Sequence, residues 1–296
     1  MGPTEGLLTA MVTPFAADGS VDEDAAVALG RHLLANGSHG LVIAGTTGES
    51  ATLTDEEQIS LVGTMASELG DEGAIVAGAG SNDTRHAAHL TARTVEAGAV
   101  AVLSVTPYYN KPNRRGLLRH FEEVARAAGG RPVILYNIPG RTALNMPADL
   151  LAELAQIDGI EGLKQANGAE LQLVDGLDVL AGDDPLLARC LDMGGTGGIC
   201  VSSHVVGNQM RRMVDEPGAR AEIDASLQDV YSTLFCTASP IPVKTALGML
   251  GHDVGGLRLP LVDASDEERE LIHAMLERHS LLGSHSPAPA QPAPTR

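Results

Sequence analysis

The chain has 296 residues and a formal net charge of −18, and a negative field of this size disfavours binding to nucleic acid or to an anionic membrane surface. Hydrophobic residues make up 44% of the chain, but aromatic residues make up only 2% and Trp is absent. A large core must therefore be built from Ala, Val, Leu and Ile, which suits the closely packed layers of a parallel β-barrel.

Short apolar runs alternate with amphipathic segments along the first 203 residues, and this alternation predicts parallel strands joined by right-handed helical crossovers. Eight such units close a (β/α)8 TIM barrel, and a barrel of this length is commonly one domain rather than two. The main alternative is a doubly wound open sheet, but no G-x-G-x-x-G turn follows the first run. The predicted strands are Leu7–Val12, Gly40–Ala44, Ala74–Ala79, Ala99–Val105, Pro132–Asn137, Ile160–Lys164, Leu177–Ala181 and Gly198–Ser202. The clearest predicted helices between them are Asp22–Asn36, Asp55–Leu69, Asp83–Ala97 and Gly116–Ala128.

Helical patterns without strands follow the predicted barrel. They predict helices at Val205–Val214, Ala219–Phe235, Ile241–Leu250 and Ser265–Leu281. We therefore divide the chain into a barrel (1–203), a C-terminal helical appendage for packing or oligomer contact (204–283) and a Pro/Ala-rich tail (284–296). The tail has too few large apolar residues to order itself, so we expect it to be disordered.

Cysteine usage and the N-terminus indicate a cytoplasmic protein. The three cysteines (Cys190, Cys200 and Cys236) are odd in number and lack metal-ligand spacing, which favours a reducing compartment over a disulfide framework. The first residues show no basic segment before an apolar one, and no apolar run is long enough to span a bilayer.

Lys164 ends the sixth predicted strand and is the first candidate for chemistry. A lysine is rarely buried without a partner or a task, and the carboxyl ends of barrel strands form the active site of such folds. Desolvation there would lower its pKa and leave a free amine able to form a Schiff base with a carbonyl substrate. The alternative is a solvated lysine that happens to end a strand.

The loops after the other strands carry further polar groups. Thr46 and Thr47 lie in a Gly-Thr-Thr-Gly-Glu-Ser turn that can hold a carboxylate; the alternative is a plain Gly-rich turn before a helix. A P-loop is excluded because the Lys-Ser/Thr pair is missing. Tyr136 can carry a proton and Arg141 can bind a carboxylate bidentately, or both can be packing and surface residues.

Two later loops are less specific. Asp183 and Asp184 follow the seventh strand and suggest either a metal site, which no His or acid cluster supports, or a helix cap before Pro185. We therefore expect no metal. The glycines around Ile199 suggest a backbone that lines a pocket.

Several of these motifs occur together and in order, and the chain thereby resembles the dihydrodipicolinate synthase family of pyruvate-dependent class I aldolases. The similarity runs from about Gly6 to Leu281. The motifs are Gly-Thr-Thr-Gly-Glu-Ser (45–50), Thr-Pro-Tyr-Tyr-Asn-Lys-Pro (106–112), Tyr-Asn-Ile-Pro-Gly-Arg-Thr (136–142), Gly-Leu-Lys (162–164) and Ile-Pro-Val-Lys (241–244).

The resemblance implies that pyruvate condenses with L-aspartate 4-semialdehyde to give 4-hydroxy-tetrahydrodipicolinate, in lysine and diaminopimelate biosynthesis. It implies that Lys164 forms the Schiff base with pyruvate, without any cofactor. Tyr136, Thr46 and Tyr109 would form a proton relay, with Tyr109 reaching into a neighbouring subunit. A homotetramer built as a dimer of dimers is therefore expected.

The resemblance also implies substrate contacts. Thr47 would hold the pyruvate carboxylate and Arg141 that of the semialdehyde, while Gly182 and the backbone of Ile199 would line the pocket. Sialic acid lyases of the wider family share Tyr-Asn-Ile-Pro but lack the arginine, so the loop resembles the synthase form. The alternatives are another pyruvate aldolase or keto-deoxy sugar acid dehydratase, N-acetylneuraminate lyase-like, or a barrel that has lost catalysis.

Some positions depart from the family pattern. Gln165 replaces a frequent acid, and Ser239 replaces a common Asn before Pro240. Lysine-sensitive relatives have His, His and Glu where this chain has Asp55, Gln58 and His86, while the matching Ser50, Ala51, Asn82 and Tyr108 are retained. Because the glutamate partner for a lysine ammonium is lost, the sequence predicts weak or absent feedback inhibition by lysine.

Overall fold

The computed structural model describes residues 2–282, and eight parallel strands in this range close into a barrel in sequence order, β1 to β8. β8 pairs with β1, with Gly6 opposite Gly197 and Leu8 opposite Ile199. This closure confirms the predicted (β/α)8 barrel and excludes the open sheet. The strands are β1 (Gly6–Ala10), β2 (Gly40–Ile43), β3 (Ala74–Gly78), β4 (Ala101–Val105), β5 (Val133–Asn137), β6 (Ile160–Gln165), β7 (Asp178–Ala181) and β8 (Gly197–Cys200).

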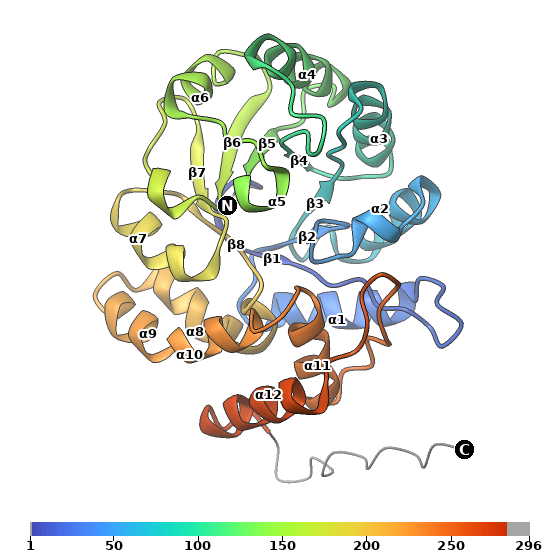
Figure 1. Ribbon diagram of the computed structural model, residues 1–296, viewed down its shortest axis with the longest axis vertical. Helices are drawn as coiled ribbons and strands as arrows, with labels where there is room; N and C mark the ends of the chain where they lie inside the picture. Colours follow the sequence, from blue (N-terminus) through green and yellow to red (C-terminus); the bar gives the residue numbers. More distant parts are fainter. Residues whose placement is uncertain (1, 283–296) are drawn as a thin grey trace.

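Helices surround the barrel on its outer face (Figure 1). Several begin at a side chain that accepts a backbone N–H and so satisfies a free donor of the first turn, as Asp22, Thr54, Asp83 and Asn113 do. The helices of this part are α1 (Glu23–Ala35), α2 (Asp55–Leu69), α3 (Thr84–Glu96), α4 (Arg114–Ala127), α5 (Pro139–Thr142), α6 (Ala148–Leu154), α7 (Leu187–Asp192) and α8 (Ser203–Asp215). The short 3-10 turns are Ser50–Thr52, Gly168–Glu170 and Asp184–Leu186.

The core between strands and helices is almost entirely aliphatic, as the composition predicts. Leu7, Leu41, Ile134 and Leu163 have no more than 1% of their surface exposed. Full burial of such a side chain contributes about 1.5–3 kcal/mol. The strands therefore hold the barrel through packing on both faces, which leaves the loops at their carboxyl ends free to carry polar groups.

A bulge in β6 sets the register of its second half. Val133 of β5 pairs with Ile160, but the next residue, Ile134, pairs with Gly162. Glu161 is therefore one extra residue in β6, and it is exposed while the rest of the strand is buried. Beyond the bulge the pairing is regular, and Lys164 lies opposite Tyr136.

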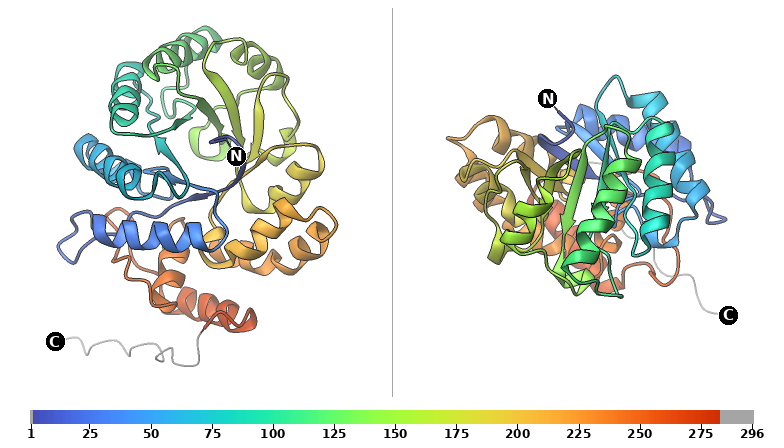
Figure 2. Two further views of the ribbon diagram at one scale, coloured as in Figure 1. Left: turned by 180° about the vertical axis from the view of Figure 1, so that it is seen from behind. Right: turned by 90° about the horizontal axis from the view of Figure 1, so that it is seen from above.

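The C-terminal helices pack beside α1 and α8 on one side of the barrel (Figures 1 and 2). They are α9 (Arg220–Ser226), α10 (Gln228–Leu234), α11 (Ile241–Met249) and α12 (Asp266–Arg278). The predicted single helix Ala219–Phe235 is wrong, because the chain bends at Leu227 between α9 and α10. The Leu227 N–H donates to Asp224 O (3.1 Å), a tighter turn than an α-helix makes, and the bend leaves the Leu227 side chain buried.

The division at residues 203 and 283 stays a prediction, and the predicted tail (284–296) lies outside the described residues. In residues 2–282 no helix is both long and apolar enough to cross a membrane.

Candidate active site

A pocket opens at the carboxyl ends of the strands, where a TIM barrel carries its chemistry. It brings Thr46 and Tyr136, two of the predicted catalytic residues, to one cavity wall. In the view of Figure 1, helix α5 lies in front of the strands, near the centre of the ring of helices. The pocket is lined by Ala44, Gly45, Thr46, Ser50, Gly78, Gly80, Leu103, Val105 and Tyr136.

Lys164 lies against Tyr136 beside this pocket. Val105, Tyr136 and Lys164 pair in register across β4, β5 and β6, so their side chains share one face of the barrel wall. The Lys164 Nζ lies 4.2 Å from the centre of the Tyr136 ring, and the two residues are only 6% and 5% exposed. Within residues 2–282 the Lys164 amine has no hydrogen bond and no ion pair. The sequence prediction of a buried lysine at the end of β6 is therefore confirmed in its geometry.

The two threonines of the Gly-rich turn differ in burial. Thr46 is exposed at the pocket wall, whereas Thr47 is buried. The turn is bonded to the segment after β1, because the Thr13 hydroxyl donates to Gly48 O (2.6 Å). Glu49 has a left-handed backbone (φ 56°), a conformation that a residue with a side chain adopts at a cost.

The loop that carries Arg141 is tied to the ends of β5 and β6. The Asn137 amide donates to Asn145 Oδ1 (3.0 Å) and to Gln165 Oε1 (3.1 Å), and its own oxygen accepts the Met146 N–H (3.1 Å). Arg141 is exposed on α5 and makes no ion pair in the described part of the chain. Its guanidinium is therefore available to an anion above the barrel opening.

Gly182 and Ile199 lie where the predicted pocket floor would be. The Gly182 N–H donates to Gln165 O (2.8 Å), and a Cβ at Gly182 would lie 2.8 Å from Ala166 N, so only glycine fits. Ile199 of β8 is 1% exposed. Neither residue lines the pocket of Thr46 and Tyr136, so their role stays a prediction.

The acids after β7 do not cap a helix, which corrects that sequence interpretation. Asp183 makes no side-chain capping bond, while Asp184, 1% exposed, accepts bonds from Val201 N (2.8 Å), Ser202 N (2.8 Å) and Ser202 Oγ (2.6 Å). Asp184 thus joins the ends of β7 and β8. Burial, and then the charge of Asp184, raises the pKa of Asp183. In residues 2–282 no group of three His, Cys, Asp or Glu side chains is arranged to hold a metal.

Tyr109 does not reach the pocket of its own chain. Its side chain is 89% exposed, on a loop in which Tyr109 itself has a left-handed backbone (φ 73°). The structure therefore brings together Lys164, Tyr136 and Thr46, and leaves Tyr109 pointing to the outside.

Three residues near the turn escaped the sequence interpretation of the site. The buried Glu49 and Lys244 and the partly buried Arg258 form a charged group next to Thr46 and Thr47. Lys244 lies in a family motif, but neither spacing nor charge pattern reveals that it faces Glu49. A buried acid in a Gly-rich turn looks the same in sequence as a solvated one.

Comparison with known proteins gives the family of this fold and site. The sequence model of the dihydrodipicolinate synthetase family matches residues 3–279. The chain belongs to this family. A 4-hydroxy-tetrahydrodipicolinate synthase of Synechocystis sp. is 42% identical over 292 residues, which cover 95% of this chain and 97% of that relative.

Solved structures agree with this family. The synthase of Cyanidioschyzon merolae, with lysine bound, is 37% identical, covers 95% of this chain and 100% of its own, and has a TM-score of 0.91. The chloride-inhibited synthase of Acinetobacter baumannii, complexed with pyruvate, is 33% identical, with coverages of 94% and 100% and a TM-score of 0.90. These matches confirm the predicted resemblance and the predicted synthase function, which is that of a lyase-type enzyme of lysine and diaminopimelate biosynthesis.

Proposed function

We propose that this enzyme condenses pyruvate with L-aspartate 4-semialdehyde through a Schiff base on Lys164, and that it needs no cofactor. The observation that carries the proposal is the contrast between two buried lysines. Lys244 has a carboxylate 2.7 Å away, whereas Lys164 has no partner in residues 2–282. Burial of an amine without a partner costs free energy, so it is expected where the amine reacts.

The chemistry follows from the reactivity of an amine toward a ketone. The Lys164 nitrogen adds to the keto carbon of pyruvate, and loss of water gives an iminium. The iminium withdraws electrons, so a proton leaves the pyruvate methyl group and an enamine forms. The enamine carbon attacks the aldehyde, and the aldehyde oxygen takes up a proton to become the 4-hydroxyl. The amine of the second substrate then displaces Lys164 as the ring closes.

Tyr136, Thr46 and Tyr109 supply the proton relay in this proposal. The support is that Tyr136 lies against the amine and shares a pocket with Thr46. Tyr109 would complete the relay in a second copy of the chain, and its 89% exposure supports that role. A homotetramer built as a dimer of dimers follows as the working assembly.

Two loops would bind the carboxylates of the substrates. Thr47 holds that of pyruvate, Arg141 holds that of the semialdehyde, and Gly182 and the Ile199 backbone line the pocket. A local cation is needed because the overall field of the chain repels anions. The three cysteines are free, which supports a reducing, cytoplasmic location.

Borohydride trapping tests the covalent step with little ambiguity, because the chain contains only three lysines: Lys111, Lys164 and Lys244. Reduction in the presence of pyruvate should convert the Lys164 Schiff base into a 1-carboxyethyl amine, which peptide mass spectrometry detects on Lys164. Lys164→Ala should abolish the adduct, and the matched control Lys111→Ala, which alters an exposed lysine, should not. An adduct of wild-type yield in Lys164→Ala would refute the mechanism.

Replacement of Arg141 separates the synthase from a sugar acid aldolase or dehydratase on the same Schiff base. Loss of a charged, bidentate contact should lower kcat/KM for the semialdehyde by roughly 10- to 100-fold in Arg141→Ala. Arg131→Ala, an exposed arginine just before β5, serves as the control. Unchanged semialdehyde turnover, or efficient sugar acid cleavage by the wild type, would favour the alternative.

Weak feedback inhibition by lysine is proposed as well. The His86 Nε2 lies 2.8 Å from Asp55 Oδ1, and the Gln58 amide donates to Ser50 O (3.2 Å). Asp55 and His86 are thus paired with each other, Gln58 is bonded to the backbone, and the glutamate of lysine-sensitive relatives is missing. Steady-state assays should show little inhibition by lysine, and half-maximal inhibition at sub-millimolar lysine would contradict this.

A further inference from the structure

The loop between α11 and α12 contacts the segment after β1 and the Gly-rich turn after β2. The Phe15 N–H donates to Val254 O (3.2 Å). A Cβ at Gly255 would lie 1.8 Å from Phe15 O, so the two backbones touch directly. Two cations from the appendage face the Phe15 ring, Lys244 Nζ at 4.2 Å and Arg258 Cζ at 4.5 Å from its centre.

Lys244 and Glu49 form a buried ion pair across this contact. The Lys244 Nζ lies 2.7 Å from Glu49 Oε1, as an ion pair rather than an aligned hydrogen bond, and the two side chains are 3% and 1% exposed. The same ammonium donates to Gly256 O (2.7 Å). Burial lowers the pKa of Lys244, and the Glu49 carboxylate opposes that shift.

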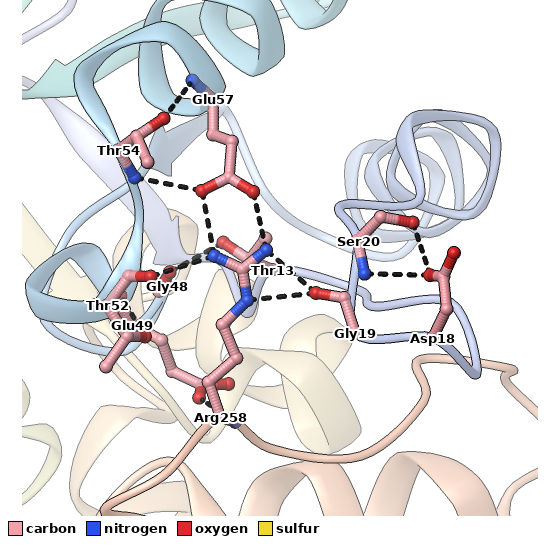
Figure 3. Close-up of polar contacts among 10 residues, drawn as sticks. All are labelled: Thr13, Asp18, Gly19, Ser20, Gly48, Glu49, Thr52, Thr54, Glu57 and Arg258. Carbon is pink, nitrogen blue, oxygen red and sulfur yellow. Dashed lines mark hydrogen bonds and ion pairs between the residues drawn. The ribbon is translucent and has the colours of Figure 1, made fainter.

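Arg258 joins the appendage to Glu49 of the turn and to three neighbouring residues, as Figure 3 shows. Its backbone N–H donates to Glu49 Oε2 (3.1 Å), and its guanidinium donates to Thr52 O (2.8 Å) and Gly19 O (2.8 Å). Two further bonds reach the Glu57 carboxylate at 2.8 and 2.5 Å. The carboxylate of Glu49 is therefore held by both a side chain and a backbone group of the appendage.

The backbone of the turn is strained at both ends, so contacts with other parts of the chain are needed to stabilise its conformation. Ala44 and Glu49, at its two ends, both have left-handed backbones (φ 54° and 56°), which side-chain-bearing residues disfavour. A buried ion pair contributes little net stability over an apolar pair of similar shape, so its retention fits a role in fixing one geometry. Thr46 and Thr47 lie between these two strained positions, on the short stretch whose geometry is being fixed.

We propose that Glu49 and Lys244 are positioning residues for keto acid binding, and that the appendage uses this pair to hold Thr46 and Thr47 in shape. The inference rests on the proposed function, because it assumes that the turn receives the carboxylate of pyruvate. It gives the C-terminal helices a task in catalysis beyond packing and oligomer contact. Neither residue touches the reacting atoms, and both act through the turn.

A double variant tests this without leaving a buried charge unpaired. Glu49→Gln combined with Lys244→Met removes both charges and keeps the side chains close in volume. The matched control is Arg220→Met, which removes another buried cation of the appendage. Arg220 pairs with Asp192 (2.5 Å) and donates to Met213 O (2.8 Å), contacts that do not include the turn.

We expect kcat/KM for pyruvate to fall by about 10- to 100-fold in the double variant, as for a small misplacement of a binding group. KM for the semialdehyde should stay within about twofold of wild type, because the turn does not bind that substrate in the proposed function. Saturating pyruvate should still give the reduced adduct on Lys164. The control should lower the melting temperature and leave the pyruvate parameters unchanged. Lys244→Arg, which keeps the charge beside Glu49, should lower kcat/KM for pyruvate less than the double variant does.

Two outcomes would overturn the inference. One is an unchanged kcat/KM for pyruvate in the double variant. The other is an equal fall of kcat/KM for both substrates, in the double variant and in Arg220→Met alike, in proportion to the loss of melting temperature. Failure of the wild type to form any adduct on Lys164 would instead refute the proposed function, so the two failures are distinguishable.

Discussion

Acid should destabilise the chain through His204, a buried imidazole at the start of α8. Its ring is 3% exposed, and its Nε2 accepts the Val12 N–H (3.2 Å) while Nδ1 donates to Val201 O (2.7 Å). A second proton would set an N–H on Nε2 against the N–H of Val12. Burial is the main reason that the pKa of His204 is lowered to about 4; the bond to Val201 O opposes this shift, and the nearby His252 and His32 add to it.

The sign and size of the effect follow from this pKa. The unfolded chain titrates His204 near 6.5, so the unfolded state binds more protons than the folded one at every pH between 6.5 and 4. The contribution of this group to stability is complete above pH 6.5 and is lost as the pH falls. The loss amounts to about 2 kcal/mol at pH 5 and about 3 kcal/mol at pH 4.

Urea unfolding at fixed protein concentration between pH 8 and pH 4.5 measures this loss. His204→Gln cannot titrate, so its free energy of unfolding should fall less steeply with acid than that of the wild type, by up to about 1.4 kcal/mol per pH unit. His89→Gln removes an exposed histidine and should leave the slope unchanged. A constant difference between His204→Gln and wild type over the whole range would refute the reasoning.

Three further predictions concern the appendage. Gly255→Ala should destabilise the chain by more than about 1 kcal/mol in denaturant unfolding, because its φ is 62° and the new Cβ would overlap Phe15 O; an unchanged transition midpoint would contradict the contact. Ser265→Ala removes the cap of α12, where the hydroxyl accepts the Glu268 N–H (3.2 Å), and should cost about 1 kcal/mol by the same assay. Thiol reagents should modify the native chain at Cys236 alone, since the other two cysteines are buried, and rapid reaction of all three without denaturant would show otherwise.

The barrel is predictable from local sequence patterns, because a buried parallel strand and an amphipathic helix each have a characteristic pattern of apolar residues. This pattern predicts both the strand that carries Lys164 and the strand that carries Tyr136. The bend at Leu227 is not predictable in this way, since it depends on where a single apolar side chain finds space in the folded appendage. The helix propensities of the residues around Leu227 do not depend on this packing, so they cannot predict the bend.

The site was predictable only in part for a related reason. Parallel topology places every strand end at one opening, so Lys164, Tyr136 and the Thr46–Thr47 turn were expected to meet there. The pairing of Glu49 with Lys244 joins residues from opposite ends of the chain. No periodicity or spacing rule links an acid in a turn to a lysine in a distant helix, and only the docked appendage brings them together.

Because β6 has one extra residue at its bulge, we expect the strand to tolerate a one-residue deletion there and not at the positions that follow. Removal of Glu161 would straighten the strand and still leave the amine opposite its tyrosine, because the pairs beyond Gly162 already match residue for residue. Removal of Leu163 would advance Lys164 by one place and turn the nucleophile out of the opening, toward the helices. Natural or engineered deletions in this strand should therefore survive, with activity intact, at its exposed glutamate and nowhere between there and the reactive nitrogen.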